Sequence, residues 1–302
     1  MKLVLYDDYK PGLLKGDAVV DISDVTRAVA GKTGQDTIEG IINNFDSLRP
    51  ALEGALAAGP SVPLSSIKLR APVPRPGKIM CMSANYREGT SKEGLPIGIF
   101  ITPSTAVLDP EGTAVLPEFE FTICHHEAEL VAIIGKQGAK VPEERWNDYI
   151  FGYTCGVDVS ARGEWAGYRS MAKSFDGFKP IGPCIVTKDE IPDANHLQVR
   201  LWVDGQLRQD YNTDDMSHRI PECVAHASKM MSIQPGDLLF LGTNHQGLGP
   251  LQDGETAEIE IERIGRIRFH ISDPLKRSWP KGVDAAVGQR VRSMLESGTR
   301  SA

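Results

Sequence analysis

A series of short strand-like segments, separated by turn-forming residues, fills most of the chain after residue 77. The segments are 78–84, 98–104, 127–135, 150–160, 183–188, 197–207, 237–243 and 256–271. Strands and helices do not alternate regularly, and neither standard glycine-rich phosphate loop is present. The pattern therefore predicts a mixed, mostly antiparallel β-core with few helices rather than a doubly wound sheet. The run VDGQ at 203–206 predicts a hairpin turn within this core.

A small α+β domain is predicted before the core. Its elements are strands within 1–8 and 16–25 and one helix over 37–59, where isoleucine and leucine recur at helical spacing. Gly59 and Pro60 end that helix. Three prolines within 70–78 indicate a linker, which gives a small N-terminal domain at 1–70 and a main domain at 71–274.

Helical patterns also occur elsewhere in the chain. Residues 141–150 and 220–233 have the spacing of short helices inside the main domain. The polar tail 275–302 is expected to be helical, because Val287, Val291 and Leu295 form one apolar stripe. Such a helix either docks on the main domain or frays.

Composition limits the classes of partner. The 302 residues include 33 Lys and Arg against 40 Asp and Glu, a formal charge of −7. This balance argues against nucleic acid or an anionic membrane as the main partner. No run of about 18 apolar residues is present, and five scattered cysteines form no CxxC pair. We expect a cytoplasmic protein with reduced thiols.

Two glutamates stand at the start of a strongly apolar segment in the sequence HHEAELVAIIG. On a strand, Glu127 and Glu129 point to the same face as His125, whereas His126 points to the opposite face. Paired carboxylates repel each other, and burial disfavours their charge. A divalent cation removes both penalties. The alternative is a strand end at which both glutamates are solvated.

A third carboxylate follows about 30 residues later, where Asp158 interrupts an apolar strand. Three carboxylates favour Mg²⁺ or Mn²⁺, with Ca²⁺ as a further candidate. The pair His125–His126 suggests zinc instead, although no HExxH motif accompanies it.

Further polar residues in the sequence can act together with these carboxylates. Arg162 and Lys173 can hold a substrate carboxylate or a developing oxyanion beside a metal. Thr243 offers a hydroxyl and a backbone N–H at a strand end, and His245 in the same glycine-rich turn is a candidate acid or base.

Taken together, these segments resemble the fumarylacetoacetate hydrolase family, in order, from about residue 77 to residue 273. The similar motifs are MSANYREG, HHEAELVAIIGK, YIFGYTCGVDVSARG, KSFDGFKPIGPCIVT, IQPGDLLFLGT and LQDGETAEIEIERIG. The resemblance implies a mixed β-sandwich roll and, in most members, a homodimer. It also implies 2-keto or β-diketo acid substrates and a metal-chelated enolate as the shared intermediate.

Carried over residue by residue, the resemblance implies metal ligands at Glu127, Glu129 and Asp158. The substrate site would be lined by Tyr86, Arg162, Lys173 and Thr243. In this reading Arg162 and Lys173 also take part in catalysis.

The chain departs from the family pattern where hydrolytic members activate water. Those members carry a histidine four residues after the motif asparagine, followed by a glutamate. Here the asparagine is Asn85, the fourth residue on is Gly89, and the nearby acid is Glu93, one position beyond expectation. The polar segment 87–95 has the composition of a mobile lid. His245 and Glu93 are therefore the candidate bases.

Acylpyruvate-type C–C bond hydrolysis is the function that these residues favour. Isomerase, decarboxylase or hydratase/dehydratase chemistry on a 2-keto acid remains open, because it needs the metal site but not the usual water-activating pair. A non-catalytic keto-acid binding protein is a further alternative.

Overall fold

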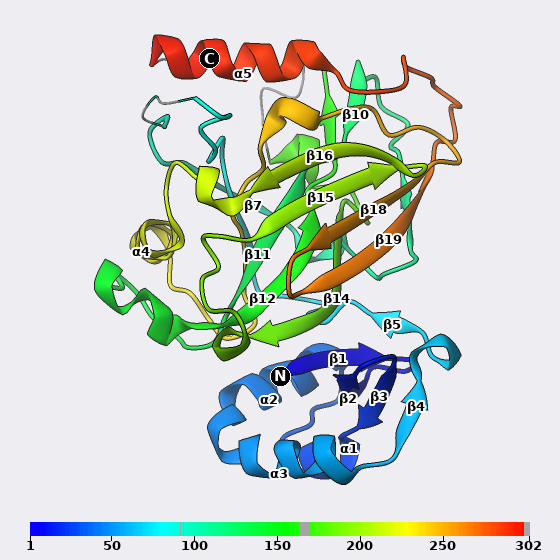
Figure 1. Cartoon of the computed structure of the whole chain (residues 1–302), viewed down its shortest axis with the longest axis vertical. Coiled ribbons are helices and arrows are strands. Elements are labelled where there is room, and N and C mark those ends of the chain that lie inside the picture. The colour runs from blue at the N-terminus through cyan, green and yellow to red at the C-terminus, as the bar shows by residue number, and fades with distance from the viewer. Residues whose placement is uncertain (91, 93, 164–169, 299–302) are drawn as a thin grey trace.

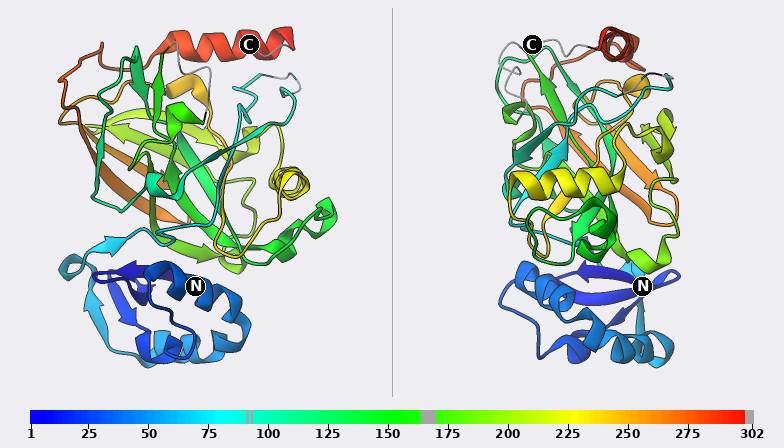
Figure 2. Two further views of the ribbon diagram at one scale, coloured as in Figure 1. Left: turned by 180° about the vertical axis from the view of Figure 1, so that it is seen from behind. Right: turned by 90° about the vertical axis from the view of Figure 1, so that its left-hand side faces the viewer.

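The computed structural model describes residues 1–90, 92, 94–163 and 170–298. Two β-sheets pack face to face in the main body (Figure 1). The N-terminal segment lies at one end of the molecule, and helix α5 (Ala285–Ser297) lies at the other (Figures 1 and 2). None of the helices in the described ranges has the length and hydrophobicity needed to cross a bilayer.

The larger sheet has twelve strands. In spatial order the main path is β4 (Ser61–Pro63), β3 (Ala18–Asp21), β2 (Lys10–Lys15), β1 (Lys2–Tyr6), β14 (Lys179–Thr187), β12 (Ile150–Val157), β11 (Ala128–Ile134), β17 (Leu238–Phe240), β6 (Ile79–Met82) and β7 (Ile99–Thr102). Two short strands join it at the side: β5 (Leu69–Arg70) pairs with β1, and β8 (Val107–Leu108) pairs with β14. Most neighbouring strands are antiparallel, as predicted, although β17 runs parallel to β6 and β14 runs parallel to β8.

The second sheet has five strands. Its order is β16 (Gln206–Asn212), β15 (Gln198–Val203), β18 (Thr256–Ile261), β19 (Gly265–Ser272) and β9 (Thr113–Val115). The predicted hairpin joins β15 to β16, with Val203 paired to Gln206. A separate pair, β10 (Ile123–His125) and β13 (Ser160–Arg162), extends beyond the ends of β11 and β12.

Strand β11 is buried on both faces, which explains its uninterrupted apolar sequence. Leu130 and Ala132 pack into the core shared by the two sheets. Val131 and Ile133 pack on the other side, in the core that the N-terminal helices cover. Alternate side chains of a strand point to opposite faces, so both faces need apolar residues. Packing on both faces consequently fixes the start of the strand, where the two glutamates lie.

The N-terminal helices are α1 (Ser23–Thr26), α2 (Gly34–Asn43) and α3 (Phe45–Ala58). The single helix expected over 37–59 is therefore two helices. Asn44 leaves the helical region, with φ −117° and ψ 14°, and its side-chain amide donates to the Gly40 carbonyl at 2.9 Å. Thr33 and Asp36 form a capping box that starts α2.

Of the two other helices predicted in the main domain, one is an α-helix and one is a 3₁₀-helix. The segment expected at 220–233 is α4 (Ile220–Met230). The segment expected at 141–150 is a 3₁₀-helix, Glu143–Tyr149. Pro142 precedes that short helix, and the buried strand β12 begins directly after it at Ile150. Only seven residues remain between these two limits, which is too few for a stable isolated α-helix.

Strand β1 joins the N-terminal segment to the main body. Lys2 pairs with Val186 and Leu3 with Ile185 of β14, while the other edge of β1 pairs with β2. The N-terminal segment thus shares a continuous sheet with β11 and β12, the strands in or next to which Glu127, Glu129 and Asp158 lie.

Removing the buried side chain of Ile41 is expected to destabilise the fold without disturbing Glu127, Glu129 and Asp158. Ile41 of α2 is 0% exposed in the core beneath β11. Ile41→Ala should lower the free energy of unfolding by roughly 2–5 kcal/mol. Val62→Ala, at a 40% exposed position, serves as the control in urea titrations. Equal midpoints for the two variants would contradict this packing.

Candidate functional site

Three buried carboxylates from two adjacent strands meet at one place. Glu129 is the second residue of β11, Glu127 directly precedes that strand, and Asp158 directly follows β12. Ala128 pairs with Val157, and the Asp158 N–H donates to the Glu127 carbonyl at 2.8 Å. One carboxylate oxygen from each of the three lies within 4.8 Å of the others. Exposure of 5% or less excludes the alternative of solvated glutamates.

Within the described part of the chain, three cations contact these carboxylates. The Lys173 ammonium donates to Glu127 Oε2 at 2.6 Å and to Asp158 Oδ2 at 2.7 Å. Lys179, the first residue of β14, is fully buried and donates to Asp158 Oδ1. Arg162 Nη2 donates to Glu127 Oε1. The charges offset one another at a depth where an unpaired charge carries a large desolvation penalty.

The two glutamates differ in their electrostatic surroundings. Burial acts against the charge on Glu127, but attraction to neighbouring cations, Lys173 first, lowers the pKa of this carboxyl. Burial, followed by repulsion from Asp158, raises the pKa of Glu129 well above its usual range. Within the described part of the chain, Glu129 accepts one hydrogen bond, from the Gly242 N–H at 2.6 Å.

This donor set fits a hard divalent cation. A bound ion would offset both the burial and the repulsion at Glu129. Among the described residues, the group with metal-ligand spacing contains only Glu127, Glu129 and Asp158. An all-carboxylate set suits Mg²⁺ or Mn²⁺ rather than zinc.

The histidines of HHEAEL do not point into this cluster. His125 Nδ1 accepts from Arg162 Nε at 3.3 Å, and His125 Nε2 lies 3.2 Å from Asp284 Oδ2. His126 points to the opposite side, where Nδ1 lies 3.0 Å from Gln209 Oε1. Burial lowers the pKa of His125 to about 4 and that of His126 to about 3, so both rings are neutral near pH 7.

Gln209 connects His126 to the predicted substrate-site residue Thr243. The Gln209 amide nitrogen donates to Thr243 Oγ1 and to the Asn244 carbonyl, both at 2.8 Å. Tyr211 Oη lies 3.5 Å from the same hydroxyl, and the Tyr211 ring packs edge-on against Tyr86 at 5.0 Å between centroids. The Tyr86 hydroxyl is buried and has no partner among the described residues.

His245 forms a pair with a carboxylate that the sequence did not single out. It begins the short 3₁₀-helix η8 (His245–Gly247). Its Nδ1 lies 2.7 Å from Glu88 Oε1, and its backbone N–H donates to Glu88 Oε2 at 2.8 Å. Glu88 is fully buried and also accepts from Gln246 Nε2 at 2.9 Å. The other predicted candidate base, Glu93, lies outside the described residues.

The pair is close to the carboxylate cluster. Gly242 contacts Glu129, and His245 follows three positions later in the same turn. An imidazole–carboxylate pair therefore stands beside the carboxylate cluster.

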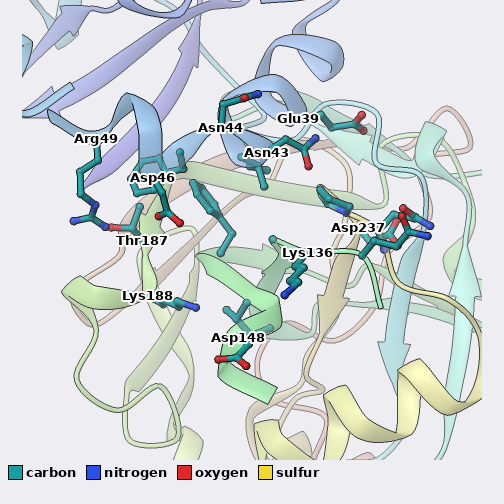
Figure 3. A pocket seen from close by; sticks show the side chains of 18 of the residues that line it. Glu39, Asn43, Asn44, Asp46, Arg49, Lys136, Asp148, Thr187, Lys188 and Asp237 are labelled. Carbon is teal, nitrogen blue, oxygen red and sulfur yellow. The ribbon is translucent and has the colours of Figure 1, made fainter. Parts of the chain in front are cut away.

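A large open cavity lies elsewhere, between the N-terminal helices and the main body (Figure 3). Its volume is about 1030 Å³, and charged side chains such as Arg49, Lys136, Asp148 and Asp237 line it. It includes no residue of the carboxylate cluster.

Four site residues escaped the sequence reasoning: Glu88, Lys179, Gln209 and Asp284. Lys179 left a signal, because a lysine at the start of the apolar run KPIGPCIVT is unusual unless a buried carboxylate receives it. The other three come from a loop, from a strand of the second sheet and from the tail. Their approach to the site depends on tertiary packing that no local pattern records.

Comparison with known proteins supports the resemblance. The model of the family described as "Fumarylacetoacetate (FAA) hydrolase C-terminal" matches residues 78–272. A maleylpyruvate hydrolase of Aquipseudomonas alcaligenes is 30% identical over 288 residues, covering 90% of this chain and 99% of that protein. A mitochondrial oxaloacetate tautomerase of Xenopus laevis is 35% identical, covering 67% and 68%, respectively.

Solved structures agree with this assignment. The maleylpyruvate hydrolase of Sphingobium sp. SYK-6, in complex with manganese(II) and pyruvate, superposes with a TM-score of 0.82 at 36% identity. The match covers 90% of this chain and 99% of that one, and it confirms the predicted fold class. On this evidence the chain belongs to the fumarylacetoacetate hydrolase family.

Proposed function

We propose that this protein hydrolyses a C–C bond of an acylpyruvate in a reaction that depends on Mg²⁺ or Mn²⁺. The observation that carries the proposal is the buried carboxylate cluster with Arg162 and Lys173 on it and the His245–Glu88 pair beside it. The two maleylpyruvate hydrolases, similar over 90% of this chain, support the substrate class.

Glu127, Glu129 and Asp158 would hold the metal ion, and the manganese(II) in the Sphingobium structure supports this assignment. A bound divalent ion supplies Lewis-acid stabilisation of negative charge on the substrate. Ca²⁺ remains a candidate because it accepts the same oxygen ligands.

Arg162 and Lys173 supply fixed positive charge next to this position. Both are held by hydrogen bonds to Glu127, so little reorganisation is needed when substrate arrives. In our proposal Arg162 binds the substrate carboxylate, and Lys173 stabilises the oxygen on which negative charge develops. Tyr86 and Thr243 complete the substrate contacts, and the unpartnered Tyr86 hydroxyl is available for one of them.

His245 is the base in this proposal. The Glu88 carboxylate accepts from Nδ1–H, which leaves Nε2 with a lone pair. Water adds to the acyl carbonyl carbon as Nε2 takes its proton. The C–C bond then breaks, its electron pair forms the pyruvate enolate, and the proton held by His245 passes to the enolate carbon. The products are a carboxylic acid and pyruvate.

Keto–enol tautomerisation is the second candidate, because the Xenopus laevis relative is an oxaloacetate tautomerase. It needs the carboxylate cluster and a proton carrier but no attacking water. Decarboxylation and hydration or dehydration belong to the same group of reactions. A binding protein without activity has no use for an imidazole paired with a buried carboxylate, so we favour an enzyme.

A homodimer and a cytoplasmic location complete the proposal. Two sheets end in strands β7 and β16, where Ile101 and Leu207 are 43% and 48% exposed. Apolar side chains on edge strands favour pairing with another chain. The five cysteines are buried and free, which agrees with a reducing compartment.

Metal binding is expected to depend on the three carboxylates. At 100 times its dissociation constant, Mn²⁺ should stabilise the parent by about 2.7 kcal/mol, seen as a rise in unfolding temperature. Glu127→Gln and Asp158→Asn should lose both this rise and turnover. Glu111→Gln, on an exposed ion pair with Arg268, is the control. A full Mn²⁺-induced rise in either cluster variant would refute the assignment of ligands.

Loss of the base is expected to reduce turnover. His245→Ala should lower kcat for an acylpyruvate by roughly 10²–10⁴-fold. Glu88→Gln should also lower kcat. His196→Ala, at an exposed histidine, is the control. If the loss follows Glu93→Gln instead, then Glu93 is the base. A parent that tautomerises oxaloacetate but cleaves no acylpyruvate would replace hydrolysis with the second candidate.

Light scattering at micromolar concentration tests the assembly. The expected mass is twice the 32.9 kDa of one chain. Ile101→Lys and Leu207→Lys, tested separately, should show which edge pairs, because a buried lysine without a partner disfavours association. A monomeric parent would count against the homodimer.

A further inference from the structure

The C-terminal segment lies against the site and contributes one side chain to it. Asp284 stands just before α5, where its backbone N–H donates to the Leu248 carbonyl at 2.7 Å. Its Oδ1 caps the helix by accepting from Ala286 N–H at 3.2 Å. Its second oxygen, Oδ2, faces His125 at 3.2 Å.

Helix α5 holds this aspartate in place through contacts with two other segments. Gln246 of η8 donates to the Gly288 carbonyl at 3.3 Å, and Arg292 Nε donates to the Glu88 carbonyl at 3.1 Å. Val291 and Leu295 form a small buried cluster with Leu95. The predicted tail helix is thus docked over both the glycine-rich turn and the segment that carries Glu88.

The hydrogen bonds of His125 fix which ring nitrogen carries the proton. Arg162 Nε can only donate, so the nitrogen that it contacts, Nδ1, must accept. A ring nitrogen that accepts a hydrogen bond carries no proton, so the ring holds one proton and is neutral. The single proton is therefore on Nε2, where the Asp284 carboxylate accepts it.

We propose that Asp284 is a positioning residue for substrate binding, acting through His125 to orient the Arg162 guanidinium. The chain of contacts runs from Asp284 to His125, from His125 to Arg162 Nε, and from Arg162 Nη2 to Glu127. Two of the three guanidinium nitrogens are thereby fixed. Nη1 makes no hydrogen bond to a described residue, which leaves it for the substrate carboxylate.

This inference rests on the proposed role of Arg162, and it gives HHEAEL a second function. The glutamates bind the ion, and the first histidine holds the arginine that binds the substrate. It also makes the C-terminal segment part of the substrate site.

The first test is the ring tautomer, measured by ¹⁵N NMR of the full-length, metal-free protein. The parent should show His125 protonated at Nε2. In Asp284→Asn, Oδ1 still caps α5, so the new NH₂ group faces His125 and the ring proton moves to Nδ1. Asp284→Ala removes the acceptor altogether. A parent protonated at Nδ1 would overturn the proposal, whatever reaction the enzyme catalyses.

The second test is pyruvate affinity in the presence of Mn²⁺, measured by calorimetry. Asp284→Asn and Asp284→Ala should weaken binding about 10- to 100-fold, as for other groups that orient a binding residue. Leu295→Ala loosens the same helix without touching the chain of contacts and should change affinity about twofold at most. Parent-like affinity in both Asp284 variants would overturn the proposal.

Arg162→Met completes a double-mutant cycle. In that background Asp284→Ala should have little further effect, because the residue through which it acts is gone. An equal loss in both backgrounds would show that Asp284 only stabilises the fold. A parent that binds no pyruvate would contradict the proposed function, and the tautomer measurement would still decide the role of Asp284.

Discussion

Balance of buried charge is the constraint on which the site depends. Three carboxylates that almost no solvent reaches stay together because Lys173, Lys179 and Arg162 contact them. Each cation comes from a different segment, so the fold must bring η5 (Met171–Lys173), β14 and β13 to one place. Removing one partner leaves a buried charge uncompensated, which is far more costly than losing an exposed ion pair.

The balance is uneven within the cluster. The cations contact Glu127 and Asp158, whereas Glu129 receives one backbone N–H and has a raised pKa. Glu127 and Asp158 thus have cationic partners, whereas Glu129 has none among the residues that the structure describes. In our proposal a divalent ion beside Glu129 would complete the balance and would link the stability of this region to occupancy of the metal site.

Much of the fold was readable in the sequence because strands and turns leave local signals. The apolar run after Glu129, the VDGQ hairpin and the stripe of Val287, Val291 and Leu295 all specify elements that the structure contains. The break at Asn44 was missed because helical spacing continues across it on both sides. The apolar pattern records which face is buried, not whether the backbone stays helical.

The candidate site was predictable only in part, for a related reason. Glu127 directly precedes β11 and Glu129 is its second residue, so the alternation of an extended chain alone places them together. Asp158 was recognised as a carboxylate that interrupts an apolar strand, and Arg162 and Lys173 as cations near it in the sequence, while the family motifs added their roles. Glu88 and Asp284 reach the site from a loop and from the tail, more than 150 residues apart from the groups that they contact. Such contacts have no periodicity.

Strand β1 has a consequence for how the polypeptide acquires this structure during synthesis. Residues 2–6 form an inner strand whose partner on one side, β14, ends at residue 187. Until the ribosome has released that stretch, Lys2 and Leu3 lack a neighbour along one edge of β1, where only Leu5 and Tyr6 can already pair with β5. Pairings of such large sequence separation form slowly and leave a strand edge open to wrong partners. Folding of the sheet that supports the carboxylates is thus expected to finish late, after more than half of the chain has emerged.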